Sequence, residues 1–194
     1  MNRYNRVTVL STVLIAVLGT TPSVSTAVIS TDSSIEKYII GDSIGHGIRT
    51  NNDGLLGNTR IGATVDNLVS MVTTVPSTDD KTVQRYVFIS VGTNDYWQGY
   101  SKEQYNHKLV KLEAKITAKL KPTKITYLIP CNTREDIVRG TRGVIDALKM
   151  GRDFRMLPCS MKEADSIHYT VYGYKHLKGL LSTDTVTYTD SGYG

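Results

Sequence analysis

Long apolar runs are missing from this 194-residue sequence except near its N-terminus. There, Arg3 and Arg6 precede an uncharged, largely apolar run over residues 7–19, and Ser25, Thr26 and Ala27 follow. This order is typical of a secretory signal peptide, so we expect cleavage after Ala27 and export to the periplasm or the extracellular space. The alternative is a retained anchoring helix, but the run is shorter than the ~20 apolar residues that a bilayer span needs. Residues 28–194 are then expected to form one domain without stable membrane insertion, with residues 182–194 as a loose tail.

A strong excess of charge is also missing. The formal net charge is +5, and it falls to +3 without Arg3 and Arg6, because residues 1–27 contain no acidic residue. Such mild basicity does not indicate a nucleic-acid-binding protein. The spacing of four lysines places them on one face of the helix expected before Pro122: Lys108, Lys111, Lys115 and Lys119. That face is either ordinary solvated surface or a region that attracts anionic polymers such as acidic glycans.

Cysteine is scarce, with Cys131 and Cys159 as the only two. Each follows a predicted strand at the same edge of the sheet, so a disulfide is expected in an oxidising compartment, and two buried thiols are the alternative. Two cysteines without further clustered ligands do not make a metal site, and His46, His107 and His176 are not spaced as metal ligands either. We therefore predict no metal.

Along the chain, short apolar runs typical of buried strands alternate with segments whose apolar residues have helical spacing. This order predicts an α/β protein with a parallel sheet. The expected strands are residues 37–41, 58–62, 85–91, 124–129 and 154–157. The expected helices are residues 64–72, a segment from the capping box of Ser101 and Gln104 to Pro122, residues 135–149, and a closing segment through Tyr174, Leu177 and Leu180. Polar side chains follow these strands and should therefore converge on one edge of the sheet.

The first strand leads into the most informative stretch of the chain. Gly41 ends the strand and Ser43 follows two residues later, with Gly45 and Gly47 expected to allow a tight turn. Asp42 is expected to support this turn. A serine at the carboxyl edge of a parallel sheet and at the start of a helix has N–H groups and a positive dipole end around it. Ser43 is therefore a candidate nucleophile.

A serine nucleophile needs a base and a site for the oxyanion, and the sequence offers both. Asp165 lies three residues before His168, so it can accept the Nδ1–H of that histidine and leave Nε2 facing Ser43. Gly62 offers a backbone N–H and Asn94 a side-chain amide. Together with the N–H of Ser43, they would form an oxyanion hole with three donors.

These groups occur in four blocks, and the blocks resemble those of the SGNH (GDSL-type) hydrolase superfamily. The blocks are Gly41-Asp42-Ser43, Gly62, Gly92-Thr93-Asn94-Asp95 and Asp165-Ser166-Ile167-His168. The resemblance implies Ser43 as nucleophile, His168 as base, Asp165 as its orienting carboxylate, and Gly62 and Asn94 as oxyanion donors. It also implies a three-layer α/β/α sandwich with a flavodoxin-like parallel sheet of about five strands, and no metal or organic cofactor.

The substrate is predicted from the residues expected near Ser43. Tyr96 and Trp97 follow Asn94, and Arg134 follows the fourth predicted strand. Aromatic faces with polar tips suit sugar rings, and ordinary packing is the alternative role. With no long apolar lid in the chain, we expect an esterase that removes O-acetyl groups from a cell-wall or capsular glycan, or acts on a small ester. The alternatives are a lysophospholipase or thioesterase acting on longer acyl chains, and a glycan-binding protein without catalysis.

Overall fold

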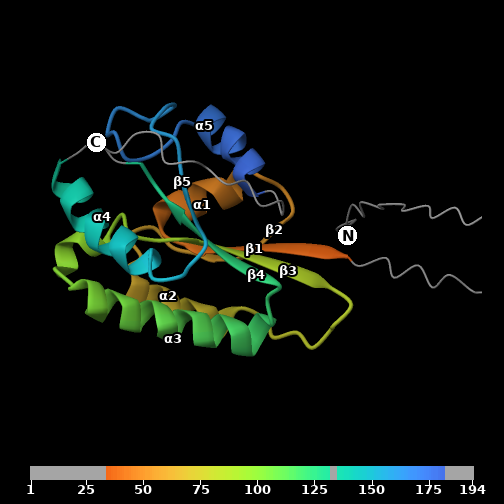
Figure 1. Cartoon of the computed structure of the whole chain (residues 1–194). Coiled ribbons are helices and arrows are strands. Elements are labelled where there is room, and N and C mark those ends of the chain that lie inside the picture. The colour runs from red at the N-terminus through yellow and green to blue at the C-terminus, as the bar shows by residue number, and fades with distance from the viewer. Residues whose placement is uncertain (1–33, 132–134, 182–194) are drawn as a thin grey trace, which may run out of the picture.

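A computed structural model of the chain describes residues 34–131 and 135–181. Its centre is a five-stranded sheet in the order β2-β1-β3-β4-β5, in which every neighbouring pair is parallel (Figure 1). The strands are β1 (Ile35–Gly41), β2 (Leu55–Thr59), β3 (Gln84–Ser90), β4 (Lys124–Ile129) and β5 (Phe154–Met156). The predicted signal peptide and the predicted loose tail lie outside the described residues.

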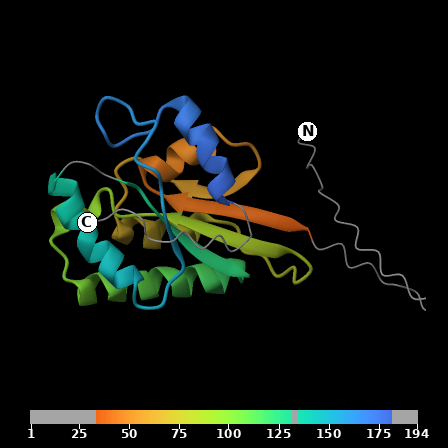
Figure 2. The ribbon, with the colours of Figure 1, turned by 45° about the horizontal axis from the view of Figure 1, so that its top comes forward.

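Helices cover both faces of the sheet and give the expected three-layer α/β/α sandwich (Figures 1 and 2). The α-helices are α1 (Ser43–Thr50), α2 (Val65–Met71), α3 (Lys102–Leu120), α4 (Glu135–Leu148) and α5 (Val171–His176). The shorter 3₁₀ helices are η1 (Val72–Thr74), η2 (Asp95–Gln98) and η3 (Leu177–Leu181). Figure 1 shows α2, α3 and α4 on one face of the sheet and α1 and α5 on the other.

The two hydrophobic cores follow from the alternation of side chains along the strands. In β1, Tyr38 and Ile40 point into the core shared with α2, α3 and α4, whereas Ile39 points into the core shared with α1 and α5. In β3, Phe88 lies beside Ile39 in register and joins the same core. Strands that are buried on both faces read as continuous apolar runs, which is why β1 and β3 could be predicted.

The second strand was predicted wrongly, since β2 covers residues 55–59 and not 58–62. Its sequence has a glycine at the centre and polar residues after it, and this does not read as a buried strand. The glycine has a structural reason, because a Cβ on Gly57 would lie 2.2 Å from the carbonyl oxygen of Ile39 in the neighbouring strand. Residues 60–62, placed in the strand by the prediction, form the loop to α2.

Gly45 and Gly47 also have a different role from the predicted one. Both lie inside α1, not in a turn. A Cβ on Gly47 would lie 2.1 Å from the ring of Tyr174, and one on Gly45 would lie 3.0 Å from the Cβ of Ser90. The glycines therefore let α1 pack closely against α5 and β3.

Half of the lysine face of α3 is occupied by local contacts. Lys108 forms an ion pair with Asp66 at 2.6 Å, and Lys119 donates to the carbonyl oxygens of Thr73 and Val75. These contacts join α3 to the α2–η1 segment, which favours the interpretation of the face as solvated surface. Within residues 34–131 and 135–181, no helix is long and apolar enough to cross a bilayer.

Candidate active site

Ser43 is the first residue of α1, directly after β1 and Asp42. Asp42 caps the helix, and its Oδ1 accepts hydrogen bonds from the backbone N–H groups of Ile44 and Gly45 at 3.0 and 3.3 Å. The cap thus uses the second and third amides of the helix and leaves that of Ser43 available to a ligand. The side chain of Asp42 is fully buried and supports the segment that carries Ser43, as expected, but this segment is the start of a helix and not a turn.

The candidate base comes from the loop between β5 and α5. His168 Nε2 lies 3.0 Å from Ser43 Oγ, and His168 Nδ1 lies 2.6 Å from Asp165 Oδ2. The other carboxylate oxygen of Asp165 accepts the backbone N–H groups of Ile167 and His168 at 2.8 and 2.9 Å. Ser166 has a φ of +59°, a left-handed conformation that makes this tight loop. The structure therefore brings together the three side chains that the sequence singled out.

The environment of Asp165 favours its ionised form. Desolvation would raise the pKa of this carboxyl, but the hydrogen bonds from His168 and from the two backbone amides outweigh it and lower the pKa to about 2. Asp165 therefore carries a negative charge at any pH near neutrality. Such a carboxylate holds the proton of His168 on Nδ1, so Nε2 can accept a proton from Ser43.

The two predicted oxyanion donors lie in loops next to each other. Asn94 Nδ2 donates to the carbonyl oxygen of Ala63 at 3.1 Å, the residue after Gly62. An amide nitrogen carries two hydrogens, so one donor of Asn94 is left for a ligand. Gly62 has a φ of +74°, a conformation that suits glycine, and no heavy atom lies within 4 Å of a Cβ built on it. Backbone geometry, not crowding, therefore requires glycine here.

A buried acidic pair behind Ser43 was not predicted. Ser90 Oγ donates to Asp42 at 2.8 Å, while Asp95 accepts from the N–H of Val65 at 2.9 Å and from the hydroxyl of Tyr105 at 3.2 Å. Burial raises the pKa of Asp42, and it raises that of Asp95 to about 6, with the Asp42 charge adding to the effect and the hydrogen bonds opposing it. Asp95 joins the starts of α2 and α3 to the loop that carries Asn94.

The structure describes the three predicted substrate-binding residues to different extents. Trp97 lies in η2 and is 75% exposed, and the backbone of Tyr96 lies in the same turn. Arg134 lies outside the described residues. Two other large side chains are exposed near motif residues. Tyr172, which flanks His168 in the sequence, is 72% exposed in α5, whereas Ile61 is 71% exposed beside Gly62 and was not predicted. The position of Ile61 next to Gly62 in the sequence was the signal that could have identified it.

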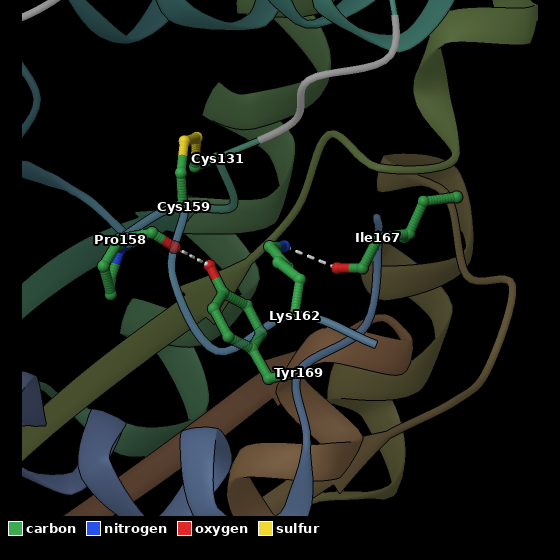
Figure 3. The surroundings of a disulfide bond; sticks show 6 residues. All are labelled: Cys131, Pro158, Cys159, Lys162, Ile167 and Tyr169. Atoms are coloured by element: carbon green, nitrogen blue, oxygen red, sulfur yellow. Dashed lines mark hydrogen bonds between the residues drawn. A yellow bond between two sulfur atoms is a disulfide. The ribbon is translucent and has the colours of Figure 1, made fainter. Parts of the chain in front are cut away.

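Cys131 and Cys159 form a disulfide, with their Cα atoms 5.0 Å apart (Figure 3). Cys131 lies two residues after the end of β4, and Cys159 lies near the start of the loop that carries Asp165 and His168. The bond therefore ties this loop to the carboxyl edge of the sheet. In the part of the chain that the structure describes, no three His, Cys, Asp or Glu side chains are grouped so that they could hold a metal ion.

Comparison with known proteins relates the chain to others through structure alone. No family model matches the sequence, and no curated protein matches it. Among solved structures, a candidate platelet activating factor from Streptococcus pneumoniae has a TM-score of 0.56 at 16% identity, over 81% of this chain and 87% of that chain. A G-D-S-L family lipolytic protein from Veillonella parvula has a TM-score of 0.55 at 19% identity, over 79% of this chain and 100% of that chain.

The aryl esterase of Mycobacterium smegmatis gives a TM-score of 0.51 at 13% identity, covering 77% of this chain and 96% of that chain. The similarity covers most of each protein. The protein therefore has the α/β fold of the SGNH (GDSL-type) hydrolases.

Proposed function

We propose that this protein is a serine esterase that works through an acyl-enzyme intermediate. The observation that carries the proposal is the 3.0 Å separation between His168 Nε2 and Ser43 Oγ, with Asp165 on the other nitrogen of the ring. A serine hydroxyl becomes a nucleophile when a base lies within hydrogen-bond reach and a third group orients that base. The contacts of His168 with Ser43 and with Asp165 support both conditions.

In the first half of the proposed reaction, Ser43 Oγ attacks the ester carbonyl carbon and His168 Nε2 takes the hydroxyl proton. The negative charge on the carbonyl oxygen is stabilised by the N–H groups of Ser43 and Gly62 and by the free amide hydrogen of Asn94. The ester C–O bond then breaks, and His168 returns the proton to the departing alcohol. The acyl group remains on Ser43.

In the second half, water attacks the acyl-enzyme carbonyl while His168 Nε2 accepts a proton from it. The second tetrahedral intermediate uses the same three donors. It collapses with release of the carboxylic acid, and the proton returns from His168 to Ser43 Oγ. Throughout, Asp165 stays ionised and stabilises the imidazolium, because its pKa is about 2.

For the substrate, we propose O-acetyl groups on a glycan of a cell wall or capsule, reached after export of the protein. The exposed rings of Trp97 and Tyr172, one near Asn94 and one near His168, support this choice, since flat aromatic faces with polar tips suit sugar rings. The second candidate is an ester with a longer acyl chain. It is favoured by the exposed side chains of Ile61, which precedes Gly62 and is 71% exposed, and of Val171, which follows His168 by three residues and is 60% exposed.

The test compares p-nitrophenyl acetate hydrolysis by the wild type and by Ser43→Ala. Loss of turnover in the variant is expected, and equal rates would reject the esterase in favour of a glycan-binding protein. Acetate and octanoate esters then separate the two substrate classes, since a strong preference for octanoate rejects the deacetylase. Acetate release from a panel of acetylated polysaccharides, peptidoglycan included, identifies the natural polymer.

A further inference from the structure

The loop that presents His168 is a small hairpin over residues 161–170. Lys162 and Tyr169 form an isolated antiparallel bridge, and the N–H of Glu163 donates to the carbonyl oxygen of His168 at 2.8 Å. A further bond runs from the N–H of Thr170 to the carbonyl of Met161 at 2.9 Å. The position of His168 therefore depends on what holds the two arms of this hairpin together.

One side chain reaches from the first arm to both neighbours of His168 (Figure 3). Lys162 Nζ donates to the carbonyl oxygen of Ile167 at 2.5 Å and lies 3.8 Å from the centroid of the Tyr169 ring. The Tyr169 hydroxyl in turn donates to the carbonyl oxygen of Pro158 at 2.7 Å, beside the disulfide. The ammonium thus fixes the peptide before His168 and the ring after it.

We propose that Lys162 is a positioning residue for His168, and that its ammonium keeps the imidazole within reach of Ser43. A charged donor on a carbonyl oxygen is about twice as strong as a neutral one, and a cation over an aromatic ring adds a second attraction. Both attractions depend on the positive charge. The inference rests on the proposed esterase function, in which the distance between His168 and Ser43 decides the rate.

The charge of Lys162 can be lost within an accessible pH range. The titratable groups around it come from two parts of the chain. Asp165 and Tyr169 lie on its own hairpin, close to His168, and Asp42 precedes α1. Burial lowers the pKa of Lys162 to about 8, while the carboxylates of Asp165 and Asp42 act in the opposite direction. The ammonium is therefore present below about pH 8 and is lost as the pH rises through that value.

The experiment measures kcat and KM for p-nitrophenyl acetate between pH 6 and 10 in the wild type, Lys162→Met and Lys162→Arg. Methionine keeps an apolar stem of similar length without charge, and arginine keeps the charge at all these pH values. At pH 7 we expect Lys162→Met to lose roughly 10- to 100-fold in kcat, with KM changed much less, because a small misplacement of the base affects the chemical step. We expect Lys162→Arg to recover most of that loss.

The pH profiles provide the decisive comparison. Wild-type kcat should fall above about pH 8 towards the value of Lys162→Met, and this decline should be absent in Lys162→Arg. Two results would overturn the proposal. One is a kcat of Lys162→Met at pH 7 that equals the wild-type value, and the other is a decline of kcat above about pH 8 in Lys162→Arg that matches that of the wild type. If Lys162→Met does not fold, as judged by circular dichroism, the profiles of the wild type and Lys162→Arg still decide.

Failure of the esterase proposal itself would be seen separately, as equal rates in the wild type and Ser43→Ala. A readout independent of turnover is amide hydrogen exchange in residues 163–168. Exchange should be faster in Lys162→Met than in the wild type at pH 7, and unchanged exchange would also contradict a positioning role.

Discussion

The Nε2 atom of His168 lies 3.0 Å from the hydroxyl oxygen of Ser43, although 125 positions separate the two residues in sequence. Ser43 is fixed by the start of α1, and His168 by a hairpin that is tied to the end of β4 through the Cys131–Cys159 disulfide. The contact is therefore made between a helix start and a hairpin that are supported independently at one edge of the sheet.

Asp165→Asn should leave the fold intact and lower kcat by up to ~10⁴-fold. The amide oxygen can still accept the N–H groups of Ile167 and His168, but the histidine is no longer held in the tautomer that presents Nε2 as an acceptor. Steady-state kinetics with p-nitrophenyl acetate measure the loss, and circular dichroism checks the fold. Full activity would mean that another acceptor orients His168.

Reduction of the disulfide should lower both stability and turnover. The bond closes a segment with a sequence separation of 28 residues, and the chain-entropy model gives roughly 3–4 kcal/mol for a loop of that size. Since the segment that begins at Cys159 carries His168, activity should also fall at temperatures below global unfolding. Thermal denaturation and initial rates with and without dithiothreitol measure the two effects.

The matched control for that experiment is the double variant Cys131→Ser/Cys159→Ser. It should show the lower stability in both buffers and no response to dithiothreitol. A wild-type protein that keeps its melting temperature and its rate after complete reduction, verified by thiol titration, would show that the disulfide does not support the hairpin.

Gly47→Ala should destabilise the protein by roughly 1–3 kcal/mol, as expected when a methyl group is forced into a packed interface. The new Cβ would lie 2.1 Å from the ring of Tyr174, so α1 and α5 would have to separate. The control is Gly179→Ala in η3, where no heavy atom lies within 4 Å of the added Cβ. Urea denaturation compares the two, and equal stabilities would contradict close packing at Gly47.

Asp95→Asn should become more stable relative to the wild type as the pH rises from about 4 to about 7. Burial raises the pKa of Asp95 to about 6 in the folded protein, above the ~3.9 of an unfolded chain, so ionisation disfavours the folded state over this range. The asparagine cannot ionise and avoids this loss. The relative gain should be on the order of 2–3 kcal/mol and constant above pH 7.

Urea denaturation of the wild type and Asp95→Asn at several pH values provides the test. The informative quantity is how the difference in free energy of unfolding between the two proteins changes with pH. The lost acceptor for Tyr105 affects the variant equally at all pH values and therefore does not contribute to that change. A difference that does not change between pH 4 and 7 would place the titration of Asp95 outside this range.

The parts of the structure that could be predicted are those with a local sequence signal. β3 has a continuous apolar run, the caps of α3 follow from Ser101 and Gln104, and the spacing of Asp165 and His168 fixes their contact within one turn. Ser43 and His168 could be brought together because parallel strands end at one edge. The fold and the triad geometry were therefore accessible from the sequence.

Features that depend on tertiary contacts were missed or misinterpreted. A lysine in a polar loop is normally solvated, and the contacts of Lys162 with Tyr169 and Ile167 have no local sequence signal. The role of Gly47 depends on the ring of Tyr174, and that of Gly57 on the neighbouring strand. No local pattern contains these partners, because each lies in a distant element of the fold.

The three side chains at the reaction centre differ in their contact with water. Ser43 is only 8% exposed, whereas the side chains of His168 and Asp165 are 40% and 45% exposed. The outer side of the imidazole is thus in direct contact with bulk solvent. In the proposed reaction, protons could be exchanged with buffer at this ring without an internal relay, and the hydrolytic water could arrive from the same open side while the acyl-bearing oxygen stays sheltered.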